Sequence, residues 1–127
     1  MNTPRPVVLV VDDDAETRAA ICDVLQENGL GVAEASNGRA ALDVLTSPDK
    51  PAVVVLDLDM PIMSGLELLD IMRRYNRLSR IPVFVLSGTD WSVAGAPVVH
   101  VFNKSGNVDA LVAAARAYAG TAAAPPA

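Results

Sequence analysis

The chain has 127 residues, 51% hydrophobic and 20% charged, which is the composition of one globular domain rather than of a disordered segment. Ten Lys and Arg residues against fifteen Asp and Glu residues give a net charge of −5, which argues against direct nucleic-acid binding. No apolar stretch approaches the roughly 18 residues of a membrane helix, and the first apolar run is too short for a signal peptide. We therefore expect a cytoplasmic domain without a membrane partner. A single cysteine, Cys22, excludes a disulfide framework and a cysteine-based zinc cluster.

Short apolar runs alternate with helical patterns along the chain. Continuous β-branched runs are typical of strands buried on both faces, and apolar residues at helical spacing are typical of amphipathic helices. In chain order the pattern predicts a strand at 7–11, a helix at 15–28, a strand at 31–35, a helix at 38–45, a strand at 52–57, a helix at 65–74, strands at 82–87 and 98–102, and a helix at 108–118. Residues 120–127 (GTAAAPPA) predict a flexible tail or the start of a linker after a domain spanning 1–119.

Acidic residues gather where the predicted strands end. Asp12, Asp13 and Asp14 follow the first strand, Asp57 ends the third, and Asp59 lies two residues further on. Alternating strands and helices imply a parallel α/β sheet with helices on both faces, whose ligand site lies beyond the carboxyl ends of the strands. Two carboxylates about 4 Å apart repel by ~4 kcal/mol at an effective dielectric of 20. Converging carboxylates therefore predict a compensating cation, and oxygen ligands suit Mg²⁺ or Mn²⁺.

Two further polar residues follow the later strands. Ser87 ends the fourth strand, and Lys104 lies just beyond the fifth. A hydroxyl and an ammonium at this edge can both contact an oxyanion. Together with the carboxylates and a metal they predict a site for phosphoryl transfer to Asp57.

Four segments resemble the response-regulator receiver domain of two-component signalling: LVVDDD at 9–14, LDLDMPIMSGLELL at 56–69, VLSG at 85–88 and NK at 103–104. The resemblance covers roughly residues 6–119. It implies a doubly wound, flavodoxin-like fold with five parallel strands in the order 2-1-3-4-5. It also implies a phosphoprotein of a two-component system or phosphorelay, in which Asp57 accepts a phosphoryl group from a histidine kinase in a Mg²⁺-dependent reaction.

The resemblance assigns roles to residues around Asp57. Asp12, Asp13, Asp57 and the backbone carbonyl of Asp59 would hold Mg²⁺.

Ser87 and Lys104 would contact the phosphoryl oxygens beside the small Gly88. Asp59 and Thr89 occupy positions that tune loss of the phosphoryl group. The implied partners are a histidine kinase or phosphotransfer protein, an output partner and, in a homodimer, a second copy of the chain.

Three features depart from the family pattern. Ser105 follows Lys104 where the family has proline, which predicts a rearranged loop. Val101 occupies the position of the family's aromatic switch residue, and the adjacent Phe102 should point to the opposite face of the strand. Only residues 88–97 separate the last two strands, and since a crossover with a helix needs about 10–12 residues, the helix between them should be shortened or lost.

Alternatives remain open at this point. Asp13 and Glu16 fit a capping box, which would make Asp13 a helix cap alone. The short crossover and the departures at Val101 and Ser105 together suit a receiver-fold binding scaffold that is uncoupled from phosphorylation. The D-x-D spacing in LDLDMP also occurs in haloacid-dehalogenase-like phosphatases, although Pro61 does not fit that class. Under the leading hypothesis the domain is no ordinary enzyme, because it acts only on its own acceptor.

Overall fold

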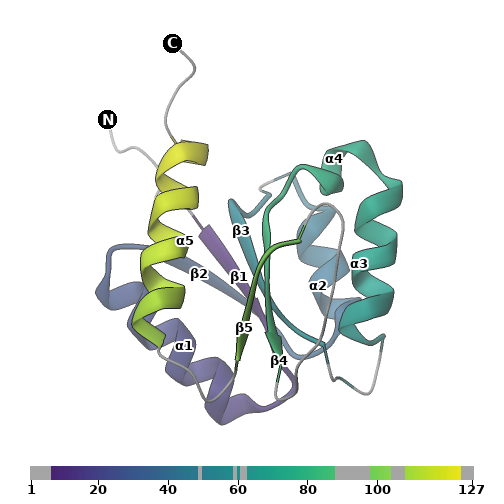
Figure 1. The fold of residues 1–127 in the computed structure, drawn as a ribbon. Helices are drawn as coiled ribbons and strands as arrows, with labels where there is room; N and C mark the ends of the chain where they lie inside the picture. Colours follow the sequence, from purple (N-terminus) through teal and green to yellow (C-terminus); the bar gives the residue numbers. More distant parts are fainter. Residues whose placement is uncertain are drawn as a thin grey trace.

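A single parallel sheet forms the centre of the computed structural model, which describes residues 7–48, 50–58, 60, 63–87, 98–103 and 108–123 (Figure 1). Its strands are β1 (Val7–Val11), β2 (Gly31–Ala35), β3 (Val53–Asp57), β4 (Val83–Ser87) and β5 (Val98–Asn103). Their order is β2-β1-β3-β4-β5 and every neighbouring pair is parallel. The predicted fold class and strand order are confirmed.

Five helices are described: α1 (Ala15–Glu27), α2 (Gly38–Leu45), α3 (Gly65–Arg74), α4 (Asn76–Ser79) and α5 (Val108–Ala123). The sequence pattern missed α4, a single turn between α3 and β4, because four residues are too few to show helical periodicity. The predicted shortening of the helix between β4 and β5 concerns residues 88–97, which lie outside the described residues.

Helices cover both faces of the sheet, as Figure 1 shows. Because side chains alternate along a strand, Leu9 and Val11 of β1 face the core shared with α2, α3 and α4, whereas Val8 and Val10 face the core shared with α1 and α5. All four side chains are fully buried. The continuous apolar runs of the sequence therefore arise from strands that have no solvent face.

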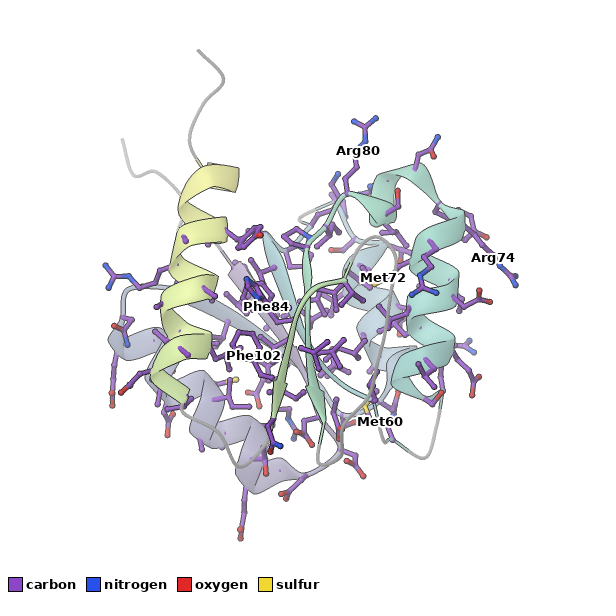
Figure 2. All side chains as sticks on the ribbon, viewed as in Figure 1. Met60, Met72, Arg74, Arg80, Phe84 and Phe102 are labelled. Carbon is purple, nitrogen blue, oxygen red and sulfur yellow. The ribbon has the colours of Figure 1, made fainter. Side chains whose placement is uncertain are left out.

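Phe84 of β4 is the centre of an aromatic cluster beneath α5. Its ring meets His100, Phe102 and Tyr118 with centroid separations of 5.4, 5.7 and 5.6 Å, and Figure 2 shows Phe84 and Phe102 between the sheet and α5. Aromatic pairs at such tilted or edge-on geometry add about 0.5–1.5 kcal/mol beyond the area they bury. The cluster fixes α5 against the edge of the sheet formed by β5.

Cys22 lies in the same core and is 4% exposed. Burial raises the pKa of its thiol to about 11, with a smaller contribution from the negative charge of Glu34. Since the thiolate is the reactive form, Cys22 is an inert packing residue at neutral pH.

The last helix is longer than the sequence pattern predicted. Helix α5 ends at Ala123 rather than at 118; three of the five added residues are alanines, the best helix formers, which favours continuing the helix beyond its apolar stripe despite Gly120. Residues 120–123 thus belong to a helix, 124–127 lie outside the described residues, and the domain boundary at 119 stays a prediction. Within the described part of the chain, no helix has the length and hydrophobicity needed to span a bilayer.

Candidate metal and phosphoryl-acceptor site

Asp12 and Asp57 lie side by side at the carboxyl edge of the sheet. Strand β1 pairs with β3, with Val11 opposite Leu56. The next residue is an aspartate in both cases: Asp12 just after β1 and Asp57 at the end of β3. One carboxylate oxygen from each of Asp12, Asp13 and Asp57 lies within 4.8 Å of the others. Asp12 and Asp57 are fully buried and Asp13 is exposed. The predicted convergence of these three carboxylates is confirmed.

The third aspartate of the run has a different task. Asp14 is the N-cap of α1 and accepts a hydrogen bond from the backbone N–H of Glu16 (3.3 Å) and from Thr17 Oγ1 (2.5 Å). The alternative in which Asp13 caps this helix is therefore wrong: the helix begins one residue later than the capping-box pattern required. Asp13 is therefore free of the capping role and is the exposed member of the acidic cluster.

These separate roles predict different effects on stability for substitutions of the two neighbouring aspartates. Asp14→Ala should lower the free energy of unfolding by about 1 kcal/mol, because the first turn of α1 loses its cap. Asp13→Ala should not lower it in metal-free buffer, because it removes one of three mutually repelling charges. Urea denaturation followed by circular dichroism measures both, and an equal loss in the two variants would contradict the assignment of the cap.

Hydrogen bonds of its backbone, as well as packing, hold Asp12 in place. Its N–H donates to the carbonyl of Ala35 in β2 (3.1 Å), and its carbonyl accepts from Arg18 Nη1 (2.6 Å). Arg18 Nε also pairs with Glu34 Oε1 at 3.1 Å. Arg18 thereby ties α1 and β2 to the end of β1. The sequence pattern did not point to Arg18, whose one signal is a cation in the first turn of the helix that follows the acidic run.

The segment after Asp57 packs closely against two glycines, Gly65 and Gly38. A Cβ on Gly65 would lie 2.5 Å from the carbonyl oxygen of Asp57 and 2.7 Å from Leu58 Cα. The N–H of Gly38 donates to the carbonyl of Met63 (3.2 Å), and a Cβ there would clash with that oxygen. Met63 itself has a left-handed φ of 52°. Helices α2 and α3 thus fix both ends of this connection at close range.

The other predicted site residues are only partly placed. The backbone of Ser87 ends β4 opposite Asn103, one position beyond Leu86, which pairs with Asp57. Asp59, Gly88, Thr89 and Lys104 lie outside the described residues, as does Ser105, and their roles stay predictions.

The position of the family's switch residue is described. Val101 is 44% exposed on β5, whereas Phe102 packs into the core on the α1 and α5 side. The prediction that Phe102 points away from the face of Val101 is confirmed.

The acidic cluster has the chemistry of a divalent-cation site. Oxygens bound to Mg²⁺ lie about 2.1 Å from the ion, so opposite ligands are about 4.2 Å apart. The observed spacing, within 4.8 Å, is short enough for one ion to reach an oxygen of each carboxylate. Two buried carboxylates this close also favour a cation electrostatically. The described donor set therefore fits a hard divalent metal ion.

Comparison with known proteins agrees with the fold and the acidic cluster. The family model of the response regulator receiver domain matches residues 8–116. The chain belongs to this family, the phosphoryl-accepting signalling domains of two-component systems, whose acidic pocket binds Mg²⁺. Family membership also accounts for the LDLDMP segment, and it replaces the phosphatase alternative.

The relatives show how much of each protein is shared. A two-component response regulator from rice (Oryza sativa subsp. japonica) is 36% identical over 87 residues, covering 68% of this chain and 65% of that protein. Response regulator MprA from Mycolicibacterium vanbaalenii is 41% identical over 83 residues, covering 65% of this chain and 35% of that protein. The chain thus spans less than two thirds of these relatives. The receiver domain of a response regulator from Francisella superposes with a TM-score of 0.78 at 28% identity, covering 92% of this chain and 98% of that one.

Proposed function

We propose that Asp57 is the phosphoryl acceptor and that Asp12, Asp13, Asp57 and the backbone carbonyl of Asp59 hold the Mg²⁺ ion, with Mn²⁺ as a substitute. The observation that carries the proposal is the joint position of Asp12, Asp13 and Asp57, with oxygens within 4.8 Å of one another at one edge of the sheet. Gathering two buried carboxylates and a third, exposed one at this spacing is costly unless a cation compensates their charge.

The transfer exchanges one bond to phosphorus for another. A carboxylate oxygen of Asp57 attacks the phosphorus of a phosphohistidine, the N–P bond breaks, and the histidine nitrogen takes up a proton from solvent. When bound, Mg²⁺ neutralises charge on the phosphoryl oxygens. The burial of Asp57 beneath Gly65 and the anchoring of Asp12 by Arg18 hold the acceptor and its neighbour in place, which is how positioning lowers the barrier.

Residues at the remaining strand ends complete the proposed site. Ser87 donates to one phosphoryl oxygen and Lys104 to another, with the small Gly88 leaving room beside them. Asp59 and Thr89 control the access of the water that hydrolyses the acyl phosphate. The domain then catalyses only its own phosphorylation and dephosphorylation.

Incubation with acetyl phosphate and Mg²⁺ tests the acceptor. The wild-type chain should gain one phosphoryl group, detected by intact-mass spectrometry and released by hydroxylamine, as expected of an acyl phosphate. Asp57→Asn should gain none, whereas Asp43→Asn, which alters an exposed carboxylate on α2, should be labelled like wild type. Labelling of Asp57→Asn, or no adduct with acetyl phosphate or beryllofluoride in the wild type, would refute the proposal.

The proposed partners follow from this chemistry. The donor is a histidine kinase or phosphotransfer protein, and the modified surface controls an output partner. Because such kinases use ATP, we expect the domain to act in the cytoplasm. The family resemblance adds a homodimer, which sizing with and without beryllofluoride tests.

A second candidate function is a receiver-fold scaffold that does not respond to phosphorylation. Val101 favours it, because a half-exposed valine lacks the ring that could move between a buried and an exposed position. Amide chemical shifts on beryllofluoride addition separate the two functions. Shifts confined to the acidic cluster support the scaffold, and shifts that reach α5 support a switch.

A further inference from the structure

The charge of the chain is unevenly distributed. Four arginines lie within eight residues that contain no acid: Arg73 and Arg74 end α3, Arg77 lies on α4, and Arg80 follows it. The rest of the sequence carries six basic and fifteen acidic residues. All four arginines are exposed, and Figure 2 shows Arg74 and Arg80 projecting from this end of the molecule. These four arginines give an otherwise acidic protein a basic face at this end.

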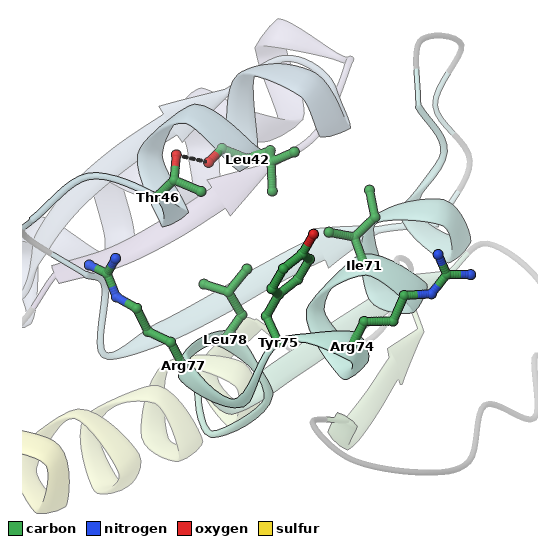
Figure 3. Close-up of a pocket in the computed structure, with 7 residues that line it drawn as sticks. All are labelled: Leu42, Thr46, Ile71, Arg74, Tyr75, Arg77 and Leu78. Carbon is green, nitrogen blue, oxygen red and sulfur yellow. Dashed lines mark hydrogen bonds between the residues drawn. The ribbon is translucent and has the colours of Figure 1, made fainter.

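An apolar hollow of about 370 Å³ opens within this basic face. Leu42 of α2 and Thr46, the residue after its end, line one side. They face Ile71, Tyr75 and Leu78 across the hollow (Figure 3). Tyr75 is 59% exposed although its ring borders apolar side chains. The volume accommodates one or two large apolar side chains, and an exposed ring beside such a hollow is typical of binding hot spots.

Two arginines frame the hollow on either side of Tyr75, as Figure 3 shows. Arg74 pairs with Asp70 at 2.8 Å, but both side chains are more than half exposed, so the pair contributes little and can exchange partners. Arg77 Nη2 donates to the carbonyl of Ser47 (2.8 Å), which holds the guanidinium at the rim. A guanidinium held in this way retains donors for a carboxylate.

The hollow lies at the opposite end of the sheet from the acidic cluster. It is lined by residues from the C-terminal parts of α2 and α3 and from α4, which lies just before the N-terminal end of β4 in the chain. Asp12 and Asp57 lie at the carboxyl ends of their strands. A ligand here leaves the phosphoryl site accessible.

We infer that this face docks an acidic segment of a partner protein, with a bulky apolar side chain in the hollow and flanking Asp or Glu residues on Arg74 and Arg77. Charge complementarity selects an acidic partner, and the hollow selects a peptide over a nucleic acid, since phosphates need no apolar pocket. Docking is independent of phosphorylation.

Selection from a random phage-displayed peptide library on the immobilised full chain tests the inference. The enriched peptides should combine Leu, Phe or Trp with neighbouring Asp or Glu. Their affinity, measured by fluorescence polarisation, should fall by about tenfold or more in Arg74→Gln/Arg77→Gln and in Tyr75→Ala. Arg116→Gln, which removes an exposed arginine from α5, is the matched control and should bind like wild type.

A second selection, on a charge-reversed variant, distinguishes a lost contact from a misfolded protein. The double variant Arg74→Glu/Arg77→Glu, once its circular dichroism is shown to be unchanged, should enrich peptides without acidic residues. The inference is overturned if no peptide is enriched on the wild-type chain, if those peptides lack acids, or if Arg116→Gln weakens binding as much as the paired variant. It is also overturned if a duplex oligonucleotide displaces the peptides, or if acetyl phosphate treatment changes their affinity. Apart from the acetyl phosphate result, none of these outcomes bears on whether Asp57 accepts a phosphoryl group.

Discussion

Replacing Gly65 with alanine is expected to lower the free energy of unfolding by about 3 kcal/mol. Helix propensity alone predicts a gain from this change, since alanine is favoured over glycine by roughly 0.5–1 kcal/mol inside helices. The sign reverses because the new Cβ would lie 2.5 Å from the carbonyl oxygen of Asp57 and 2.7 Å from Leu58 Cα. Both are backbone atoms of the segment that carries the acceptor, so the clash is relieved only by moving α3 or the end of β3.

Gly29 provides the matched control for this prediction. It has a φ of +85°, and a Cβ added to it would meet no atom within 4 Å, so Gly29→Ala measures the cost of backbone conformation without a clash. That cost should be about 1 kcal/mol. Urea denaturation of both variants in metal-free buffer gives the comparison, and a Gly65→Ala loss no larger than that of Gly29→Ala would contradict the steric argument. Failure of Gly65→Ala to fold would be the extreme form of the expected result.

The strands were the most predictable part of the fold. The runs at 7–11 and 52–57 are continuous and β-branched because each strand is buried on both faces, and such runs differ sharply from amphipathic helices. The structure places the strands at Val7–Val11 and Val53–Asp57. Helix ends were less predictable, as α4 and the last turn of α5 show, because short turns and alanine-rich ends have no apolar periodicity.

The site was predictable where topology alone brings residues together. Asp12 and Asp57 could be placed side by side because the ends of neighbouring parallel strands share one edge. The aspartate that caps α1 could not be predicted, because Asp13 and Asp14 are neighbours in the sequence and the choice between them depends on where the helix begins. Arg18 and the packing of Gly38 against Met63 depend on contacts between distant segments, which no local pattern encodes.

Removing the metal, or one of its proposed ligands, should abolish most phosphoryl transfer. With EDTA, or in Asp13→Asn, labelling by acetyl phosphate is expected to slow by ~100-fold, because the developing charge on the phosphoryl oxygens loses its counterion. Binding of Mg²⁺ should also raise the free energy of unfolding. At a Mg²⁺ concentration about tenfold above its dissociation constant, the wild-type domain should gain about 1.4 kcal/mol of unfolding free energy.

Comparing Asp14→Asn with Asp13→Asn distinguishes a residue that coordinates the metal from one that only adds negative charge nearby. Asparagine caps helices as well as aspartate does, so Asp14→Asn should keep both the Mg²⁺-dependent stability gain and the labelling rate, although it removes the same charge one residue away. Asp13→Asn should lose the gain while matching or exceeding the wild type in metal-free stability, because the carboxylates of Asp12 and Asp57 lose a repelling neighbour within 4.8 Å. An identical Mg²⁺ response in the two variants would mean that nonspecific charge, rather than coordination by Asp13, governs the site.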